Sequence, residues 1–67
     1  MARLIQFMTD MDNPALVNLD QISWAVLEKR QGGDKLMIWA GGRQSTVQSG
    51  EETTRVWNLL QQASAEQ

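Results

Sequence analysis

The sequence predicts an α+β fold in which a four-stranded antiparallel β-sheet is covered on one face by one C-terminal helix. Two segments, Ser23–Arg30 and Lys35–Ala40, are rich in β-branched and aromatic residues and are bounded by charges and glycines, which is typical of strands. Near the C-terminus, apolar residues recur at helical spacing. The length of 67 residues predicts one domain that spans residues 1–67.

The first strand is expected at Arg3–Thr9, where apolar residues lie on both sides. Alternation places Leu4 and Met8 on one side and Ile5 and Phe7 on the other. Residues 10–14 read as a turn, because Asp and Asn side chains bond the local backbone and proline is excluded from regular pairing.

The second strand is expected to contain a corner. An extended piece, Ala15–Val17, is followed by one helical turn with Asn18 as its N-cap and Gln21 at the third helical position. We expect the strand to resume at Ile22, so that the chain forms a meander of four strands.

Two reversals should connect the last three strands. If residues 31–34 form the first loop, Arg30 pairs with Lys35 and Val26 pairs with Trp39. The second reversal is Gly41-Gly42, which suits a two-residue hairpin turn because glycine adopts positive φ without steric cost. Its register predicts that residue 39 faces residue 44, residue 37 faces residue 46 and residue 36 faces residue 47.

Alternation along these strands separates the side chains into two faces. The aliphatic face carries Ala25, Leu27, Leu36, Ile38, Ala40 and Val47. The aromatic face carries Trp24, Val26, Met37, Trp39, Gln44 and Thr46. We expect the helix to cover the aliphatic face, which leaves no obvious cover for the aromatic face.

The helix is expected from about Gly50 to Ala63. Ser49 and Glu52 fit a capping box, in which each side chain bonds the other residue's backbone N–H. A stripe of four apolar residues at helical spacing follows. Its members are Val56, Leu59, Leu60 and Ala63.

The order of these features resembles the FlbD-like small proteins associated with bacterial flagellar genes. The resemblance rests on an N-terminal strand, an N-x-D-x-I corner at Asn18, Asp20 and Ile22, two strands joined by glycine turns, and a helix start at Ser49 with two glutamates. It implies the topology described above and brings no catalytic residues. The chain departs from the family at residues 10–14, where the family has a glycine-containing turn.

The composition limits the kinds of binding site and partner that the chain can have. The chain has no cysteine and no histidine, so disulfides, thiolate sites and the usual zinc and iron sites are excluded. The net charge is −2 and the six basic residues are scattered, which gives no broad nucleic-acid footprint. No apolar run approaches the ~20 residues of a membrane span, so we expect a cytoplasmic protein.

Three groups of residues could carry chemistry. Asp10 and Asp12 resemble the opening of a calcium loop, but Gln21 stands where the bidentate glutamate is required. The glycine pairs at 32–33 and 41–42 do not precede a helix, so they favour hairpin turns over phosphate loops. The remaining candidates for catalysis are turn carboxylates, two lysines and hydroxyls, so we expect no enzyme, no catalytic residue, no metal and no cofactor. The lysines and hydroxyls are Lys29, Lys35, Ser23, Ser45 and Thr46.

The leading functional hypothesis is a non-enzymatic, self-associating interaction module that uses the aromatic face, most simply as a two-fold dimer, or a protein partner on that face. The alternative is a small adaptor or regulator that binds a peptide or single-stranded nucleic acid, with Trp24 and Trp39 stacking on bases beside Lys35 and Arg43. A third possibility is a monomer in which the first strand folds over the tryptophans.

Overall fold

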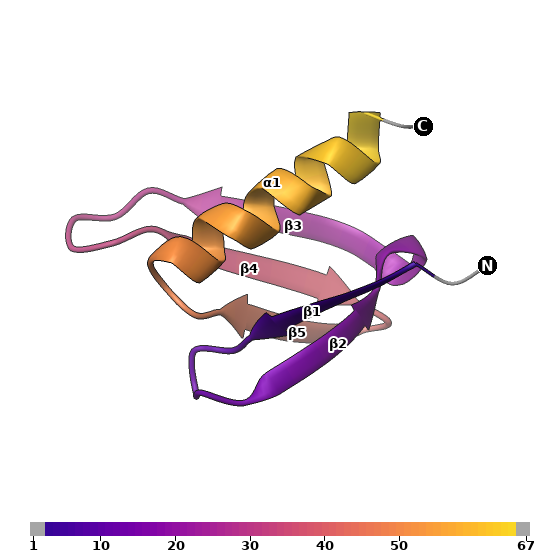
Figure 1. The fold of residues 1–67 in the computed structure, drawn as a ribbon, viewed down its shortest axis with the longest axis horizontal. Helices are drawn as coiled ribbons and strands as arrows, with labels where there is room; N and C mark the ends of the chain where they lie inside the picture. The colour runs from indigo at the N-terminus through magenta and orange to yellow at the C-terminus, as the bar shows by residue number, and fades with distance from the viewer. Residues whose placement is uncertain (1–2, 66–67) are drawn as a thin grey trace.

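The chain begins with a β-hairpin that packs beside a separate three-stranded sheet (Figure 1). The computed structural model describes residues 3–65. In the hairpin, β1 (Leu4–Met8) pairs antiparallel with β2 (Pro14–Asn18), and Ile5 lies opposite Val17. As predicted, alternation divides β1 into a buried side, with Ile5 and Phe7, and an outer side, where Leu4 is 60% exposed.

The turn of this hairpin is closed by Thr9. The backbone N–H of Thr9 donates to the carbonyl of Asn13 (2.8 Å), and the hydroxyl of Thr9 accepts from the backbone N–H of Asn13 (3.2 Å). Asp12 adopts a positive φ of 65°, which aspartate tolerates better than most side chains. Pro14 pairs with Met8 as the first residue of β2, where proline is permitted, so the expected loss of pairing at Pro14 is wrong.

The predicted corner is present as a short 3₁₀ turn, η1 (Leu19–Gln21). Asn18 is its N-cap, and its side-chain oxygen accepts from the N–H of Asp20 (3.0 Å). The turn redirects the chain so strongly that the strands on its two sides join different sheets. The prediction of one four-stranded sheet is therefore wrong: five strands form a two-stranded and a three-stranded sheet.

The larger sheet has the order β3-β4-β5, with β3 (Ile22–Glu28), β4 (Lys35–Ala40) and β5 (Arg43–Val47). The register of β4 with β5 is the one predicted. In the hairpin of β3 and β4, the predicted register is wrong by two residues because the loop spans residues 29–34. Lys35 pairs with Glu28 and not with Arg30, and Val26 pairs with Met37 and not with Trp39. A shift of two residues preserves the parity of each strand, so both predicted faces survive.

Backbone contacts connect the two sheets. Thr9 forms a bridge with Val47, the N–H of Asp10 donates to the carbonyl of Thr46 (3.0 Å), and the N–H of Gln48 donates to the carbonyl of Met8 (2.8 Å). The end of β1 thus continues the hydrogen bonding beyond β5, and the two sheets wrap around one core.

The helix α1 (Glu51–Ala65) lies across the aliphatic face of the larger sheet (Figure 1). Its Val56 is fully buried, and Thr53 is buried at its start, where the hydroxyl donates to the carbonyl of Gln48 (2.7 Å). The buried hydrophobic residues come from β1, β4, β5 and α1. They are Ile5, Phe7, Leu36, Ile38, Val47 and Val56. The aromatic face is on the opposite side of the sheet.

Candidate functional site: an aromatic sheet face and the edge beside it

The centre of the aromatic face is a pair of stacked indoles. Trp24 on β3 lies directly opposite Trp39 on β4. Their ring centroids are 4.7 Å apart and their planes differ by 22°, an arrangement that aromatic pairs favour. A β-bulge between Ile22 and Trp24 precedes the pair, and the hydroxyl of Ser23 within it donates to the carbonyl of Trp39 (3.3 Å).

The other side chains of this face extend the pair along and across the strands. Val26 lies opposite Met37, and Met37 lies opposite Thr46. On β5, the amide of Gln44 donates to the hydroxyl of Thr46 (3.0 Å). All six predicted residues are therefore brought together. Trp24 and Gln44 are exposed, and the other four are half-buried.

Trp24 also borders a second feature, an open groove beside β3. This groove, of about 650 Å³, lies between the start of β3 and the C-terminal half of α1. Trp57 and Leu60 form its helical wall, and Ala25 is on its strand wall. No pattern in the sequence predicts this groove, because its shape depends on the angle at which α1 crosses the sheet.

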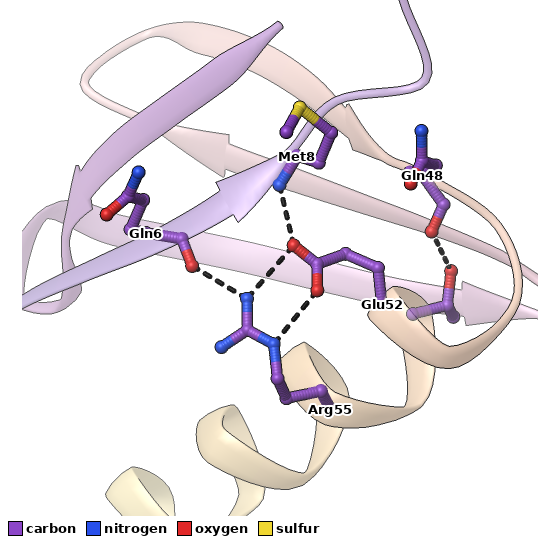
Figure 2. Close-up of polar contacts among 6 residues, drawn as sticks. Gln6, Met8, Gln48, Glu52 and Arg55 are labelled. Atoms are coloured by element: carbon purple, nitrogen blue, oxygen red, sulfur yellow. Dashed lines mark hydrogen bonds and ion pairs between the residues drawn. The ribbon is translucent and has the colours of Figure 1, made fainter. Parts of the chain in front are cut away.

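A polar cluster joins α1 to β1 (Figure 2). The carboxylate of Glu52 accepts from the backbone N–H of Met8 (2.7 Å) and from the guanidinium of Arg55 (2.9 and 3.0 Å). Arg55 also donates to the carbonyl of Gln6 (2.8 Å). Glu52, which was predicted to complete a capping box with Ser49, thus uses its carboxylate to hold a neighbouring strand.

These contacts set the charge states of the pair. The guanidinium of Arg55 and the N–H of Met8 lower the pKa of the Glu52 carboxyl below its ordinary value, against a smaller opposing effect of burial. The hydrogen bond to Glu52 raises the pKa of Arg55 above its ordinary value. Both groups are therefore held in their charged forms, which suits an anchor between helix and strand. The spacing of Glu52 and Arg55 on the helix was the available signal for their contact with each other, but not for their contact with β1.

The remaining residues considered for chemistry are dispersed. The carboxylate of Asp12 accepts from the amide of Gln48 (2.9 Å) at the hairpin turn, and Lys29 pairs with Asp34 (3.1 Å) in the β3–β4 loop. Lys35 is at the end of the aromatic face, opposite Glu28. Arg43 alternates with Gln44 and so is on the other face of β5, away from the tryptophans.

Two features are absent from residues 3–65. No group of three or more acidic, histidine or cysteine side chains in this range could hold a metal ion. In the same range, no helix is both long enough and apolar enough to cross a membrane.

Comparisons of the chain with protein-family models, with curated proteins and with solved structures found no match.

Proposed function

We propose that this protein is a non-enzymatic interaction module that associates with a second copy of itself through the aromatic face. The observation that carries this proposal is the stacked pair of Trp24 and Trp39 on the sheet face opposite α1. Trp24 is 60% exposed although it is one of the largest apolar side chains in the chain. Stacking on Trp39 holds its indole in place, so little side-chain entropy is lost when a partner covers it.

The energetic gain from covering this indole is substantial. A tryptophan buries about 150–250 Å² when it is fully enclosed, so the exposed part of Trp24 offers on the order of 100 Å². At about 25 cal/mol per Å², covering it contributes about 2–3 kcal/mol for each copy. A two-fold dimer gains this twice, and tryptophans are frequent anchors in such interfaces.

The local charges favour a protein surface over nucleic acid. Of the two cations expected beside the tryptophans, Arg43 is on the other face, and Lys35 lies across the strands from Glu28, whose carboxylate accepts from Arg30 (2.9 Å). The rings also stack on each other, so each presents one open face at most to a base. A platform for single strands needs a row of unopposed cations beside open rings.

Sedimentation equilibrium of the wild-type chain from micromolar to millimolar concentration tests this proposal. The apparent mass should rise from that of a 7.6 kDa monomer to about twice that value. A monomer throughout this range would overturn the proposal. A titration with a single-stranded oligonucleotide at low salt accompanies it, and binding there would instead favour the nucleic-acid alternative.

A further inference from the structure

The open edge of β3 is the feature that the aromatic face alone does not explain. Within residues 3–65, β3 has one hydrogen-bonded neighbour, β4. The N–H of Ile22 donates to the carbonyl of Leu19 at the end of η1, and the backbone hydrogen bonds of turns and loops do not involve residues 23–28. Every second N–H and C=O along this edge therefore points away from the sheet. Another extended chain is the partner that satisfies such a row.

The β3 edge also lacks most of the features that prevent an additional strand from pairing with an exposed edge. Exposed edge strands usually carry proline, lysine or inward-pointing charges. Residues 22–27 contain neither a charge nor a proline, and the bulge at Ser23 is near the start of the strand. The β2 edge of the smaller sheet is shorter and begins with Pro14, and the β5 edge is partly occupied by the bonds of Thr46 and Gln48 to the chain around Met8 and Asp10. Of these edges, β3 is the longest and the one suited to accept a strand.

We propose that two copies of this chain pair antiparallel through β3 and form one continuous six-stranded sheet. This inference rests on the proposed self-association and places its contact at the β3 edge of the aromatic face, where the second copy covers the flank of Trp24 while the rest of the face stays open. The pairing with the largest overlap of residues 22–28 has its two-fold axis at Ala25, so that Trp24 of one copy lies opposite Val26 of the other. Because antiparallel pairing in this register keeps side chains of equal parity on one face, the two aromatic faces become one.

In this register the apolar rows of the two copies join end to end. Trp39 and Trp24 of one copy continue into Val26 and Met37 of the second copy, and the same row runs in the opposite direction beside it. On the other side of the sheet, the small side chain of Ala25 meets its own copy. The second β3 also enters beside the groove at α1, so one occupant covers the edge and the groove and adjoins the exposed indole.

This register also avoids like charges. Beyond the ends of the paired strands, Arg30 of each copy comes opposite Asp20 of the other, although within one copy Arg30 pairs with Glu28 (2.9 Å) and Asp20 pairs with Arg3 (3.4 Å). Pairing centred on Glu28 would instead oppose two carboxylates. A stable interface takes about 800 Å² from each partner, roughly one sixth of the 4815 Å² surface of this chain. The β3 edge, the groove and the indole of Trp24 lie next to one another.

Single-cysteine variants test the pairing, because the wild-type chain has no cysteine. In the proposed dimer, the two Ala25 Cα atoms are about 4.5–5.5 Å apart, within the range of about 4.4–6.8 Å that a disulfide spans. Oxidised Ala25→Cys should run as a covalent dimer on a non-reducing gel. The matched control is Glu28→Cys on the same strand, whose two copies are separated by six residues, or about 20 Å, and should stay uncrosslinked.

The control variant also gives a second readout. Spin labels on Glu28→Cys should report a backbone separation of about 20 Å by pulsed electron paramagnetic resonance, even if Ala25→Cys folds poorly. A wild-type dimer by mass, with no crosslink through Ala25→Cys or with equal crosslinking of both variants, would overturn the edge pairing and leave the self-association intact. A monomeric wild type would overturn both. A monomer whose β3 amide signals shift only when an unrelated extended peptide is added would assign the edge to a peptide and likewise overturn this proposal.

Discussion

The two faces of the β3-β4-β5 sheet are built from adjacent residues of the same strands but differ in what covers them. On the aliphatic face, Leu36 and Ile38 are 0% and 1% exposed beneath α1. On the aromatic face, their neighbours Met37 and Trp39 remain half-buried, and Trp24 is exposed. The difference does not come from hydrophobicity, because both faces are apolar. It comes from the number of covering elements, since one helix shelters one face of a sheet.

The largest expected difference between the faces is in folding stability. Leu36→Ala should lower the free energy of unfolding by about 2–5 kcal/mol, because it removes a fully buried side chain and leaves a cavity. Met37→Ala, the next residue on the opposite face, should cost less than half as much at concentrations where the chain is monomeric. Urea unfolding followed by circular dichroism measures both. Equal losses would mean that the faces do not differ as described.

Removal of the indole at Trp39 should weaken self-association more than it lowers folding stability. Trp39→Ala should weaken self-association at least ten-fold, because interface anchors typically contribute about 2 kcal/mol or more. The helix-covered core should remain folded. Sedimentation provides the association constant, and Leu16→Ala, which removes an exposed leucine from β2, is the control. The same weakening by Leu16→Ala would place the interface on the hairpin of β1 and β2.

A smaller effect is expected at the anchor that holds α1 over the aliphatic face. The pKa of Glu52 is lowered in the folded chain, so its contribution is fully present above the pKa of the unfolded state and is lost as the pH falls through the folded pKa. Wild type should therefore lose more stability than Glu52→Gln between pH 7 and pH 3, by about 1 kcal/mol or less because solvent screens the pair. Thermal unfolding across this range measures the difference.

Glu51→Gln is the matched control for Glu52→Gln, since Glu51 is an exposed carboxylate in the same turn of α1. It should follow the wild-type profile. If Glu51→Gln flattened the profile as much as Glu52→Gln does, the pH dependence would reflect net charge and not the contact with β1.

The smallest effect should come from the polar margin of the aromatic face. Gln44→Ala should change the free energy of unfolding by about 0.5 kcal/mol or less, since an exposed hydrogen bond between side chains is replaced by water. Association should change little for the same reason. A loss comparable to that of Trp39→Ala, in either urea unfolding or sedimentation, would move the centre of the interface toward β5.

The sequence predicted the faces better than the sheets. Gly41-Gly42 defined the register of β4 with β5, because a two-residue glycine turn leaves few alternatives. The loop at 29–34 is longer than expected, so the register of β3 with β4 differs from the predicted one by two residues. The assignment of side chains to the two faces is unaffected, but the stacking of Trp24 on Trp39 was not predicted. Whether the strands flanking η1 share a sheet depends on the angle of that turn, which the residues from Asn18 to Gln21 do not specify. The contact of Glu52 with Met8 depends on the packing of α1 against β1, which spacing along the chain does not reveal.

The most direct test is a dilution series of the isotope-labelled chain by nuclear magnetic resonance, from millimolar to micromolar concentration. If the aromatic face is the surface of self-association, the indole N–H signals of Trp24 and Trp39 should shift with concentration, while the methyl signals of Leu36, Ile38 and Val56 stay in place. Indole signals that do not change over the whole series, or shifts confined to Leu4 and Leu16 on the other sheet, would contradict the proposal.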